Sequence, residues 1–145
     1  MRVLALDLGT RTGWAVTPSE SGVWRFPSIK GAHPGNRLLQ FERTIRDYVR
    51  VSDLVVYEKV MGHGKGGTAA AHLYGAFEGF LFATCAVDDT PVRSCHVGTL
   101  KKHATGNGRA SKEEMIIAAQ DAFGMKVQDD NHADALWLLD WARAP

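Results

Sequence analysis

The chain has 145 residues, of which 45% are hydrophobic and 23% charged, so we expect one domain around a single core, spanning residues 1–145. No apolar run approaches the ~20 residues of a membrane span, and Asp7 interrupts the apolar N-terminus where a signal peptide would continue. We therefore expect a cytoplasmic protein with no membrane partner. The net charge is +1, but residues 1–58 carry 8 basic and 6 acidic groups, residues 59–112 carry 7 and 3, and residues 113–145 carry 2 and 7.

The first third of the chain predicts three antiparallel strands followed by a helix. Residues 2–7 are nearly all apolar, which predicts a strand buried on both faces. Residues 9–13 predict a turn, and residues 14–16 and 23–26 predict two further strands joined by a polar turn. Apolar side chains at helical spacing then predict an amphipathic helix over residues 36–51.

The rest of the chain alternates strands and helices. A strand over residues 54–57 ends at Glu58, and the glycine-rich residues 61–67 predict a loop. The predicted helix over residues 68–86 is apolar on most of its surface, which favours a second buried face such as a dimer interface. The remaining predicted elements are a strand at 91–95, a short helix at 97–103, a helix opened by the Ser111/Glu114 capping box and running through Phe123, and a last helix at 130–142.

This order of elements predicts an α/β fold, with a five-stranded mixed sheet covered by helices on both faces. Many functions share that architecture, so function has to be argued from individual residues. Cys85 and Cys95 lie in apolar surroundings, which predicts reduced packing residues. The histidines lack zinc-site spacing and residues 62–68 lack the order of a phosphate-binding loop, so we expect neither zinc nor a nucleotide cofactor.

Two acidic residues, Asp7 and Glu58, end apolar strands. An ionised carboxylate left dry and unpaired there would cost several kcal/mol, so each needs a partner. In one interpretation Asp7 caps the Gly-Thr turn that follows it, and Glu58 forms a salt bridge with Lys59 or Arg11. In the other, the two strands are neighbours and both carboxylates reach the same edge of the sheet.

A third acidic group opens the last predicted helix, where residues 129–134 read DDNHAD. A helix N-cap role is expected for Asp129, and Asp130 or Asn131 also suits that position. Asp134 lies about one turn inside the helix between two alanines, which allow close approach to the sheet, and Asp130 projects from the same side four residues earlier. His132 either orients a water or touches a phosphate, or it is a partly exposed histidine at the helix start.

Carboxylates that converge in this way repel each other unless a hard divalent cation lies between them. Mg²⁺ prefers oxygen ligands, and two ions ~4 Å apart would hold a phosphodiester for in-line attack by water. The predicted catalytic residues and metal ligands are Asp7, Glu58, Asp130 and Asp134.

Four stretches of the chain resemble the RuvC family of Holliday-junction resolvases. The family's first strand and turn, with its catalytic aspartate, are similar to LALDLGTRTGWAV, which contains Asp7. Its strand with the catalytic glutamate is similar to VVYEKV, which contains Glu58. Its lysine-containing segment resembles LKKHATGNGRASKEEM, and its final metal-binding helix resembles HADALWLL with Asp134. The order and spacing of the four motifs together are specific.

The resemblance implies an RNase H-like fold, a homodimer, and magnesium-dependent paired nicking of four-way DNA junctions, with Mn²⁺ able to replace Mg²⁺. Water attack would leave a 5′-phosphate and a 3′-hydroxyl. It also implies that Lys101 and Lys112 meet DNA phosphates, and the basic middle of the chain agrees. The predicted DNA-binding residues are Lys65, Lys101, Lys102, Arg109 and Lys112. The chain is short for a bacterial resolvase, which favours a compact phage-type member acting in a host cytoplasm.

One departure from the family leaves the fourth metal ligand open. The family often has an acid or a histidine three residues before its last aspartate, and this chain has Asn131 there, so Asp130 or His132 is a possible substitute. Two alternative functions also stay open. One is a nuclease of the YqgF kind, which would act on RNA ends; the other is a junction-binding protein without catalytic activity.

Overall fold

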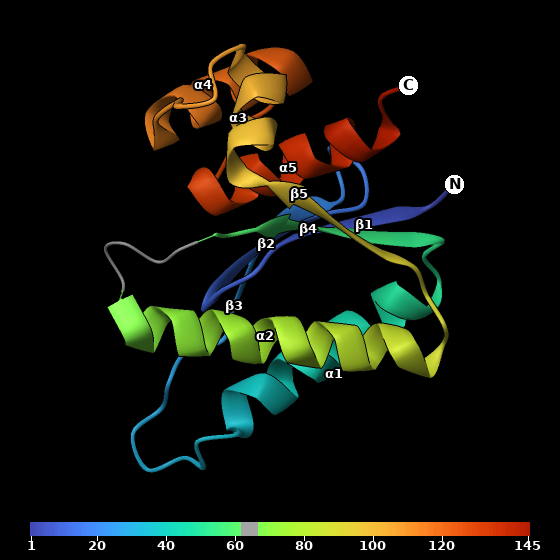
Figure 1. Ribbon diagram of the computed structural model, residues 1–145, viewed down its shortest axis with the longest axis vertical. Helices are drawn as coiled ribbons and strands as arrows, with labels where there is room; N and C mark the ends of the chain where they lie inside the picture. The colour runs from blue at the N-terminus through green and yellow to red at the C-terminus, as the bar shows by residue number, and fades with distance from the viewer. Residues whose placement is uncertain (62–66) are drawn as a thin grey trace.

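A computed structural model describes residues 1–61 and 67–145. Within these ranges a single five-stranded sheet runs in the order β3-β2-β1-β4-β5 and separates two layers of helices (Figure 1). The strands are β1 (Val3–Asp7), β2 (Arg11–Ala15), β3 (Ser21–Arg25), β4 (Leu54–Lys59) and β5 (Val92–His96). The helices are α1 (Asn36–Arg50), α2 (Gly67–Val87), α3 (Val97–Thr105), α4 (Lys112–Phe123) and α5 (Asp130–Arg143).

The sheet is mixed, as predicted. The first three strands pair antiparallel, whereas β1 pairs parallel with β4 and β4 parallel with β5. Helices α1 and α2 cover one face and α3, α4 and α5 cover the other (Figure 1). The predicted α/β architecture with helices on both faces is therefore confirmed.

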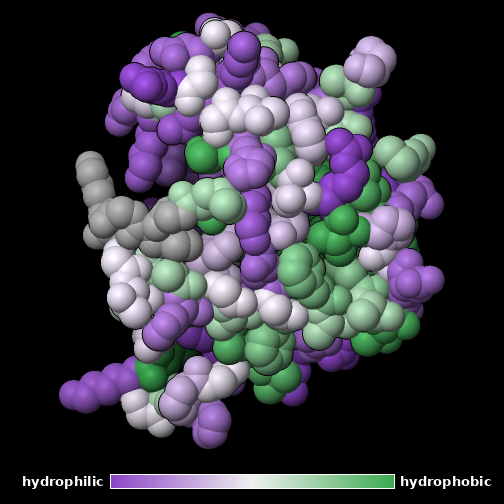
Figure 2. All heavy atoms as spheres, in the orientation of Figure 1, coloured by the Kyte–Doolittle hydropathy of each residue, from purple (hydrophilic) through white to green (hydrophobic). Residues whose placement is uncertain are grey.

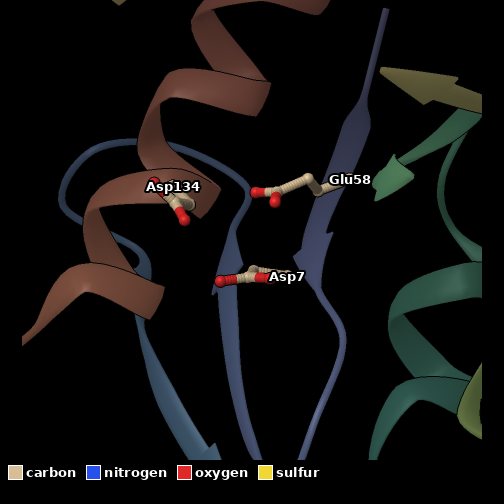
Figure 3. Close-up of side chains that lie close together, drawn as sticks. All are labelled: Asp7, Glu58 and Asp134. Atoms are coloured by element: carbon tan, nitrogen blue, oxygen red, sulfur yellow. The ribbon is translucent and has the colours of Figure 1, made fainter. Parts of the chain in front are cut away.

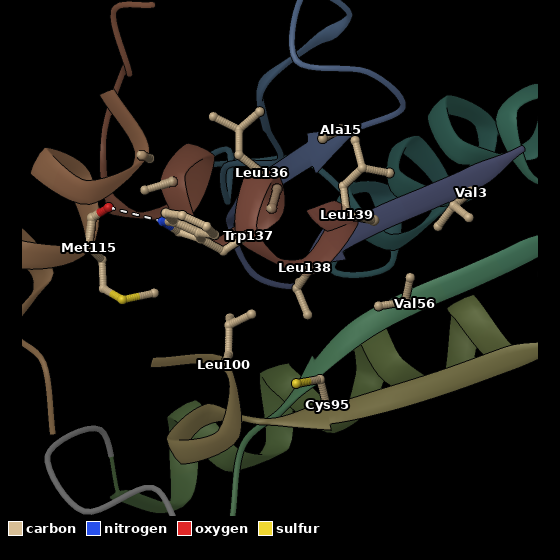
Figure 4. Close-up of a cluster of buried hydrophobic side chains, with 14 of the residues drawn as sticks. Val3, Ala15, Val56, Cys95, Leu100, Met115, Leu136, Trp137, Leu138 and Leu139 are labelled. Carbon is tan, nitrogen blue, oxygen red and sulfur yellow. Dashed lines mark hydrogen bonds between the residues drawn. The ribbon is translucent and has the colours of Figure 1, made fainter. Parts of the chain in front are cut away.

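Alternate residues of the central strand β1 enter two separate cores, because successive side chains of a strand point to opposite faces. Leu4 and Leu6 pack towards α1 and α2, in a cluster that includes Phe41 and Phe77. Val3 and Ala5 pack towards α5 in the other cluster, whose labelled side chains are drawn in Figure 4. This division explains why β1 reads as a nearly continuous apolar run.

The hairpin of β2 and β3 begins earlier along the chain than the sequence predicted. β2 starts at Arg11, inside the stretch predicted to be a turn, and β3 starts at Ser21. The turn is shorter because the Thr12 hydroxyl donates to the Gly9 carbonyl (2.7 Å), which closes it within a few residues. Gly13 is consequently a strand residue.

Helix α2 also departs from the prediction, because it is long and apolar enough to cross a membrane by length and composition alone. Its Phe77 and Leu81 are buried in the core beneath the sheet. Glu78, near the middle of the helix, accepts hydrogen bonds from Tyr57 (2.7 Å) and Lys59 (2.9 Å). α2 therefore packs as a helix of the folded domain.

Candidate metal centre

Asp7 is the last residue of β1, and Glu58 is the last but one of β4, the neighbouring parallel strand, which extends one residue past the predicted end. The register pairs Ala5 with Val56 and Leu6 with Tyr57, so the next residues along β1 and β4 are the two acids. Parallel strands end at the same edge of a sheet, which brings both carboxylates to one place. Asp7 continues the face of Val3 and Ala5, which is the face covered by α5.

The third acid comes from α5, and the start of this helix is fixed in three ways. The Asp129 carboxylate accepts a hydrogen bond from the His132 amide (2.9 Å), which confirms the predicted N-cap. The His132 ring bonds to the Ser21 hydroxyl on β3 (2.8 Å). Gly13 on β2 lets the helix approach the sheet, because a Cβ there would lie 1.9 Å from the Asn131 carbonyl oxygen.

These constraints place Asp134 opposite the two strand carboxylates, and all three side chains point towards one another (Figure 3). One carboxylate oxygen of each of Asp7, Glu58 and Asp134 lies within 4.8 Å of the others. Glu58 is 6% exposed, and its Oε2 atom is buried without a hydrogen-bond partner among the described residues. Three convergent carboxylate oxygens, together with a buried Glu58 oxygen that has no partner among the described residues, are suited to coordinate a hard cation.

Burial disfavours the ionised forms of all three acids, and repulsion from neighbouring carboxylates adds to this effect. Desolvation, followed by the charges of Glu58 and Asp134, raises the pKa of Asp7 well above its ordinary value. Desolvation also raises the pKa of Glu58, although a hydrogen bond with Asp134 and the charge of Lys101 oppose this. Desolvation, then Glu58 and Asp130, raises the pKa of Asp134 to about 8. A divalent cation at this position would favour the ionised forms.

The carboxylates line an open pocket together with two of the predicted DNA-binding residues. Its lining residues are Asp7, Glu58, Val97, Lys101, Lys112, Met115, Asp130, Asn131 and Asp134. Lys112 lies 3.8 Å from the Asp130 carboxylate and is mostly exposed. The structure thus brings Lys101, Lys112 and Asp130 to the acidic trio.

Two other predicted DNA-binding residues are not among the described residues that line the pocket. Lys102 and Arg109 are exposed, on α3 and on the turn that follows it. Lys65 lies outside the described residues, as does most of the loop predicted over residues 61–67. A role for these three in DNA binding stays a prediction.

The structural interpretations of Asp7 and Glu58 are wrong. The Gly9 amide, which Asp7 would have capped, instead contacts the Thr12 hydroxyl (3.4 Å). Lys59 pairs with Glu78 (2.9 Å), and neither Lys59 nor Arg11 forms a salt bridge with Glu58 in the described parts of the chain. Among the described residues, therefore, neither carboxylate has the partner that these interpretations gave it.

Both interpretations of His132 are also wrong, because the side chain is buried and used by the protein. It is 2% exposed, its Nδ1 accepts the Gln128 amide proton (3.1 Å), and its Nε2 bonds to Ser21. Burial lowers the pKa of His132, which keeps the ring neutral. With both nitrogens engaged, His132 has no free atom for a metal or a phosphate, which leaves Asp130 and Asn131 as fourth-ligand candidates.

Sequence reasoning missed Gly13 as a residue that shapes the site. Its signal was an isolated glycine in a stretch that alternates like a strand, which indicates a close backbone approach. The predicted turn hid that signal, because a glycine in a turn needs no further explanation.

Comparisons with known proteins are consistent with this site. No protein-family model matches the chain. The crossover junction endodeoxyribonuclease RuvC of Nitratidesulfovibrio vulgaris strain DP4 is 30% identical over 146 residues, covering 95% of this chain and 82% of the relative. The protein of the same name from Corynebacterium efficiens is 29% identical over 163 residues, covering 100% and 70%.

Solved structures support the same fold. The structure of Thermus thermophilus RuvC in complex with Holliday junction substrate matches with a TM-score of 0.76 at 20% identity, over 96% of this chain and 90% of that one. A second T. thermophilus RuvC structure gives a TM-score of 0.74 at 17% identity, over 96% and 91%. The fold is thus the RNase H-like fold of those proteins. Together with the sequence identity across most of both chains, this establishes that the chain belongs to the RuvC family of crossover junction endodeoxyribonucleases.

Proposed function

We propose that this protein is a magnesium-dependent endonuclease that cleaves Holliday junctions or other branched DNA. The observation that carries the proposal is the convergence of Asp7, Glu58 and Asp134 within 4.8 Å, with one Glu58 oxygen buried and unpartnered among the described residues. The relatives' shared name, crossover junction endodeoxyribonuclease, supports DNA junctions as the substrate. A DNA substrate also fits the cytoplasmic location expected from the sequence.

The residues at the site fit Mg²⁺, with Mn²⁺ as a substitute. All the candidate ligands are oxygens: the carboxylates of Asp7, Glu58 and Asp134, with the Asp130 carboxylate or the Asn131 amide oxygen at the pocket wall. A bound divalent ion supplies Lewis-acid stabilisation of the phosphodiester and lowers the pKa of an attacking water. The three carboxylates would hold the ion, and the hydrolysis would leave a 5′-phosphate and a 3′-hydroxyl.

The two lysines in the pocket would hold the DNA backbone against the carboxylates. Lys101 lies close enough to the three carboxylates for its positive charge to oppose the rise in the pKa values of Glu58 and Asp134. Lys112 is at the start of α4, where the helix dipole and the exposed amides also favour an anion. Phosphate contacts of this kind position the strand without reading its sequence.

We further infer a homodimer formed through the α1–α2 face, since two strands of a junction require two active sites. Apolar side chains are exposed along this face: Leu39 (41%), Phe80 (39%), Phe82 (45%) and Val87 (80%). Hydrophobic residues gather over the C-terminal half of α2 in Figure 2. An apolar patch of this kind is typical of a surface that a second copy covers.

The dimer can be tested by light scattering on Phe80→Glu, which places a charge in the groove lined by Leu39 and Phe80. The matched control is Ile117→Glu, which adds the same charge at an exposed position on α4, on the other face of the sheet. We expect Phe80→Glu to be monomeric and Ile117→Glu to be dimeric. A wild-type protein that is monomeric at micromolar concentration would contradict the dimer.

The substrate is tested by offering synthetic four-way junctions, linear duplex and single-stranded RNA, each with Mg²⁺, with Mn²⁺ and with chelator. We expect metal-dependent cutting of the junction in preference to both other substrates. Preferential cutting of RNA would favour the YqgF-like alternative. Equal cutting of all three substrates would refute junction selectivity while leaving the nuclease chemistry intact.

Asp7→Asn separates a nuclease from a junction-binding protein without catalytic activity. Loss of a metal ligand should reduce cleavage by more than about 100-fold, while junction binding persists. Removing a residue that only hydrogen-bonds to a metal ligand already costs up to about 100-fold. Asp121→Asn, the same change at an exposed position on α4, should retain full activity. Unchanged cleavage by Asp7→Asn would refute the proposed mechanism.

A further inference from the structure

Two arginines face each other at the open end of the β2–β3 hairpin. The register pairs Arg11 at the start of β2 with Arg25 at the end of β3, and both are exposed. Residues directly opposite on antiparallel strands have Cβ atoms about 5 Å apart, so like charges there are destabilising. The charge repulsion of this pair is therefore expected to oppose the folding of the free protein.

Both arginines lie on the face of the sheet that carries the metal centre. Asp7 pairs with Gly13, and Arg11 is two residues further along β2, so by alternation it shares the face of Gly13. Ser21 and Arg25 share that face on β3, and the Ser21 bond to His132 on α5 confirms which face it is. Arg11 therefore extends about 7 Å past the row of Asp7 along its strand.

The charges at this end of the hairpin are not neutralised by acids. Neither Arg11 nor Arg25 forms a salt bridge within residues 1–61 and 67–145. A third guanidinium, that of Arg37, donates to the Phe26 carbonyl (3.0 Å) and the Thr10 hydroxyl (2.7 Å), which are both neutral. Arg37 thus braces the hairpin end and adds a positive charge to it.

The strand order shows how the charged residues are arranged around the carboxylates. At the edge of the sheet where Asp7 and Glu58 lie, the charged residues follow the order of the strands. Arg25 is on β3, Arg11 on β2, Asp7 on β1 and Glu58 on β4. Lys101 is on α3, the helix that follows β5. Basic residues therefore flank the carboxylates on two sides. Lys101 is on one side, and the arginine pair is on the other.

We propose that Arg11 and Arg25 form a phosphate-binding site for the DNA strand being cut, on the opposite side of the metal centre from Lys101. Strands are about 4.8 Å apart and the backbone carries one phosphate per about 3.4 Å of helix axis, so the bound phosphate lies about one to three nucleotides from the scissile one. A guanidinium binds phosphate in bidentate fashion, and DNA would relieve the repulsion of the pair. This inference rests on the proposed action on DNA.

The salt dependence of junction binding tests the site. Fluorescence anisotropy with a labelled four-way junction in chelator, over a range of salt concentrations, is compared for wild type, Arg11→Ala, Arg25→Ala and the double variant. Each change should weaken binding about tenfold and reduce the slope of log K against log salt by about 1. The control is Arg43→Ala, which removes an exposed arginine on α1, on the far face of the sheet, and should leave the slope unchanged.

Thermal unfolding of the same variants separates binding from folding. Removing one arginine of a repelling pair should leave the melting temperature unchanged or raise it. Weaker binding together with a lower melting temperature would overturn the proposal in favour of a structural role.

A backbone scan locates the contact. Neutral methylphosphonate groups are placed one at a time within three nucleotides on each side of the cleavage position. One or two of them should weaken binding by wild type but not by the double variant. Equal sensitivity of both proteins at every position would overturn the proposal.

The failure of the inference and the failure of the proposed function have different outcomes. If wild type does not bind the junction, the proposed function fails. If wild type binds with a steep salt dependence that the double variant retains, the function stands and the arginine site is refuted.

Discussion

The two faces of the sheet are built from different side chains. On the α1–α2 face, Phe26, Phe41 and Phe77 pack ring against ring, with centroids 5.0 to 6.2 Å apart, within a cluster of aliphatic and aromatic side chains. On the α5 face an apolar cluster of similar kind gives way, at the ends of β1 and β4, to Asp7 and Glu58. The buried side of the α1–α2 layer thus contributes stability, whereas the α5 face also holds like charges together.

The difference shows what the pleat of a strand makes possible. Leu6 and Asp7 are adjacent in β1, yet one packs against the aromatic cluster and the other faces α5. The stability contributed by the aromatic cluster on the α1–α2 face can offset the repulsion between carboxylates on the α5 face. Changes on the two faces should therefore have separable effects on folding and on metal binding.

The largest expected effect comes from the aromatic face. Phe77→Ala should lower the free energy of unfolding by about 3–5 kcal/mol, because it leaves a cavity between α1 and α2. Affinity for Mn²⁺ in the protein that remains folded should be unchanged. Leu138→Ala, on α5 one turn beyond Asp134, should weaken both stability and Mn²⁺ binding. Denaturant titration and calorimetry measure the two quantities, and equal Mn²⁺ losses in both variants would contradict the separation.

The seating of α5 is tested by Gly13→Ala. A Cβ at residue 13 would meet the Asn131 carbonyl, so the helix must shift, at a cost of about 1–3 kcal/mol. Mn²⁺ affinity should fall about 10- to 100-fold, because Asp134 moves with the helix. Gly9→Ala, in the neighbouring turn, meets no atom nearer than 3.7 Å and should change neither quantity much. A Gly13→Ala protein with wild-type affinity would show that the close approach does not position Asp134.

The repulsion among the acids predicts how stability depends on pH without metal. A carboxyl group whose pKa is higher in the folded than in the unfolded protein stabilises the fold at low pH, and this contribution is lost as pH rises past the folded value. The pKa of Asp134 is raised to about 8, and that of Asp7 is also raised. The metal-free melting temperature should therefore fall between pH 5 and pH 9.

Asp134→Asn should remove part of that fall and melt several degrees higher than wild type at pH 9. Mg²⁺ should raise the melting temperature of wild type but have little effect on this variant. A wild-type melting temperature that rises from pH 5 to pH 9 in chelator would contradict the assigned directions of the pKa shifts.

The smallest expected effect concerns the bond between β3 and α5. Ser21→Ala leaves His132 without its Nε2 partner and should cost about 1 kcal/mol of stability. Ser19→Ala, at an exposed position two residues earlier, should cost less. Equal melting temperatures for the two variants would remove Ser21 from the account of how α5 is held.

Sequence patterns could predict most of the fold because the strands and helices have strong local signals. The capping box at Ser111 begins α4 as predicted, and the Asp129 cap begins α5. The β2–β3 hairpin was misplaced because a side-chain bond from Thr12, which no periodicity reveals, closes the turn early. Hydrogen bonds of this kind compete with secondary structure and depend on local geometry.

The acidic site was predictable for a different reason. A carboxylate at the end of an apolar strand needs a partner, and two such strands in parallel must share an edge. The burial and hydrogen bonding of His132 were not predictable, because its partner Ser21 is 111 residues away in sequence. A contact between two polar side chains that are far apart in the chain gives no pattern in the sequence. Each of the three acids, in contrast, stands out because it lies in an apolar strand or helix.

The most direct test of the central claim is where a divalent ion binds. Crystals grown with Mn²⁺ should give an anomalous scattering peak among the carboxylate oxygens of Asp7, Glu58 and Asp134, and the peak should be absent in Asp134→Asn. A peak in contact with all three side chains is the result that the account predicts. Crystals in which Mn²⁺ binds elsewhere while these three carboxylates hold none would contradict it.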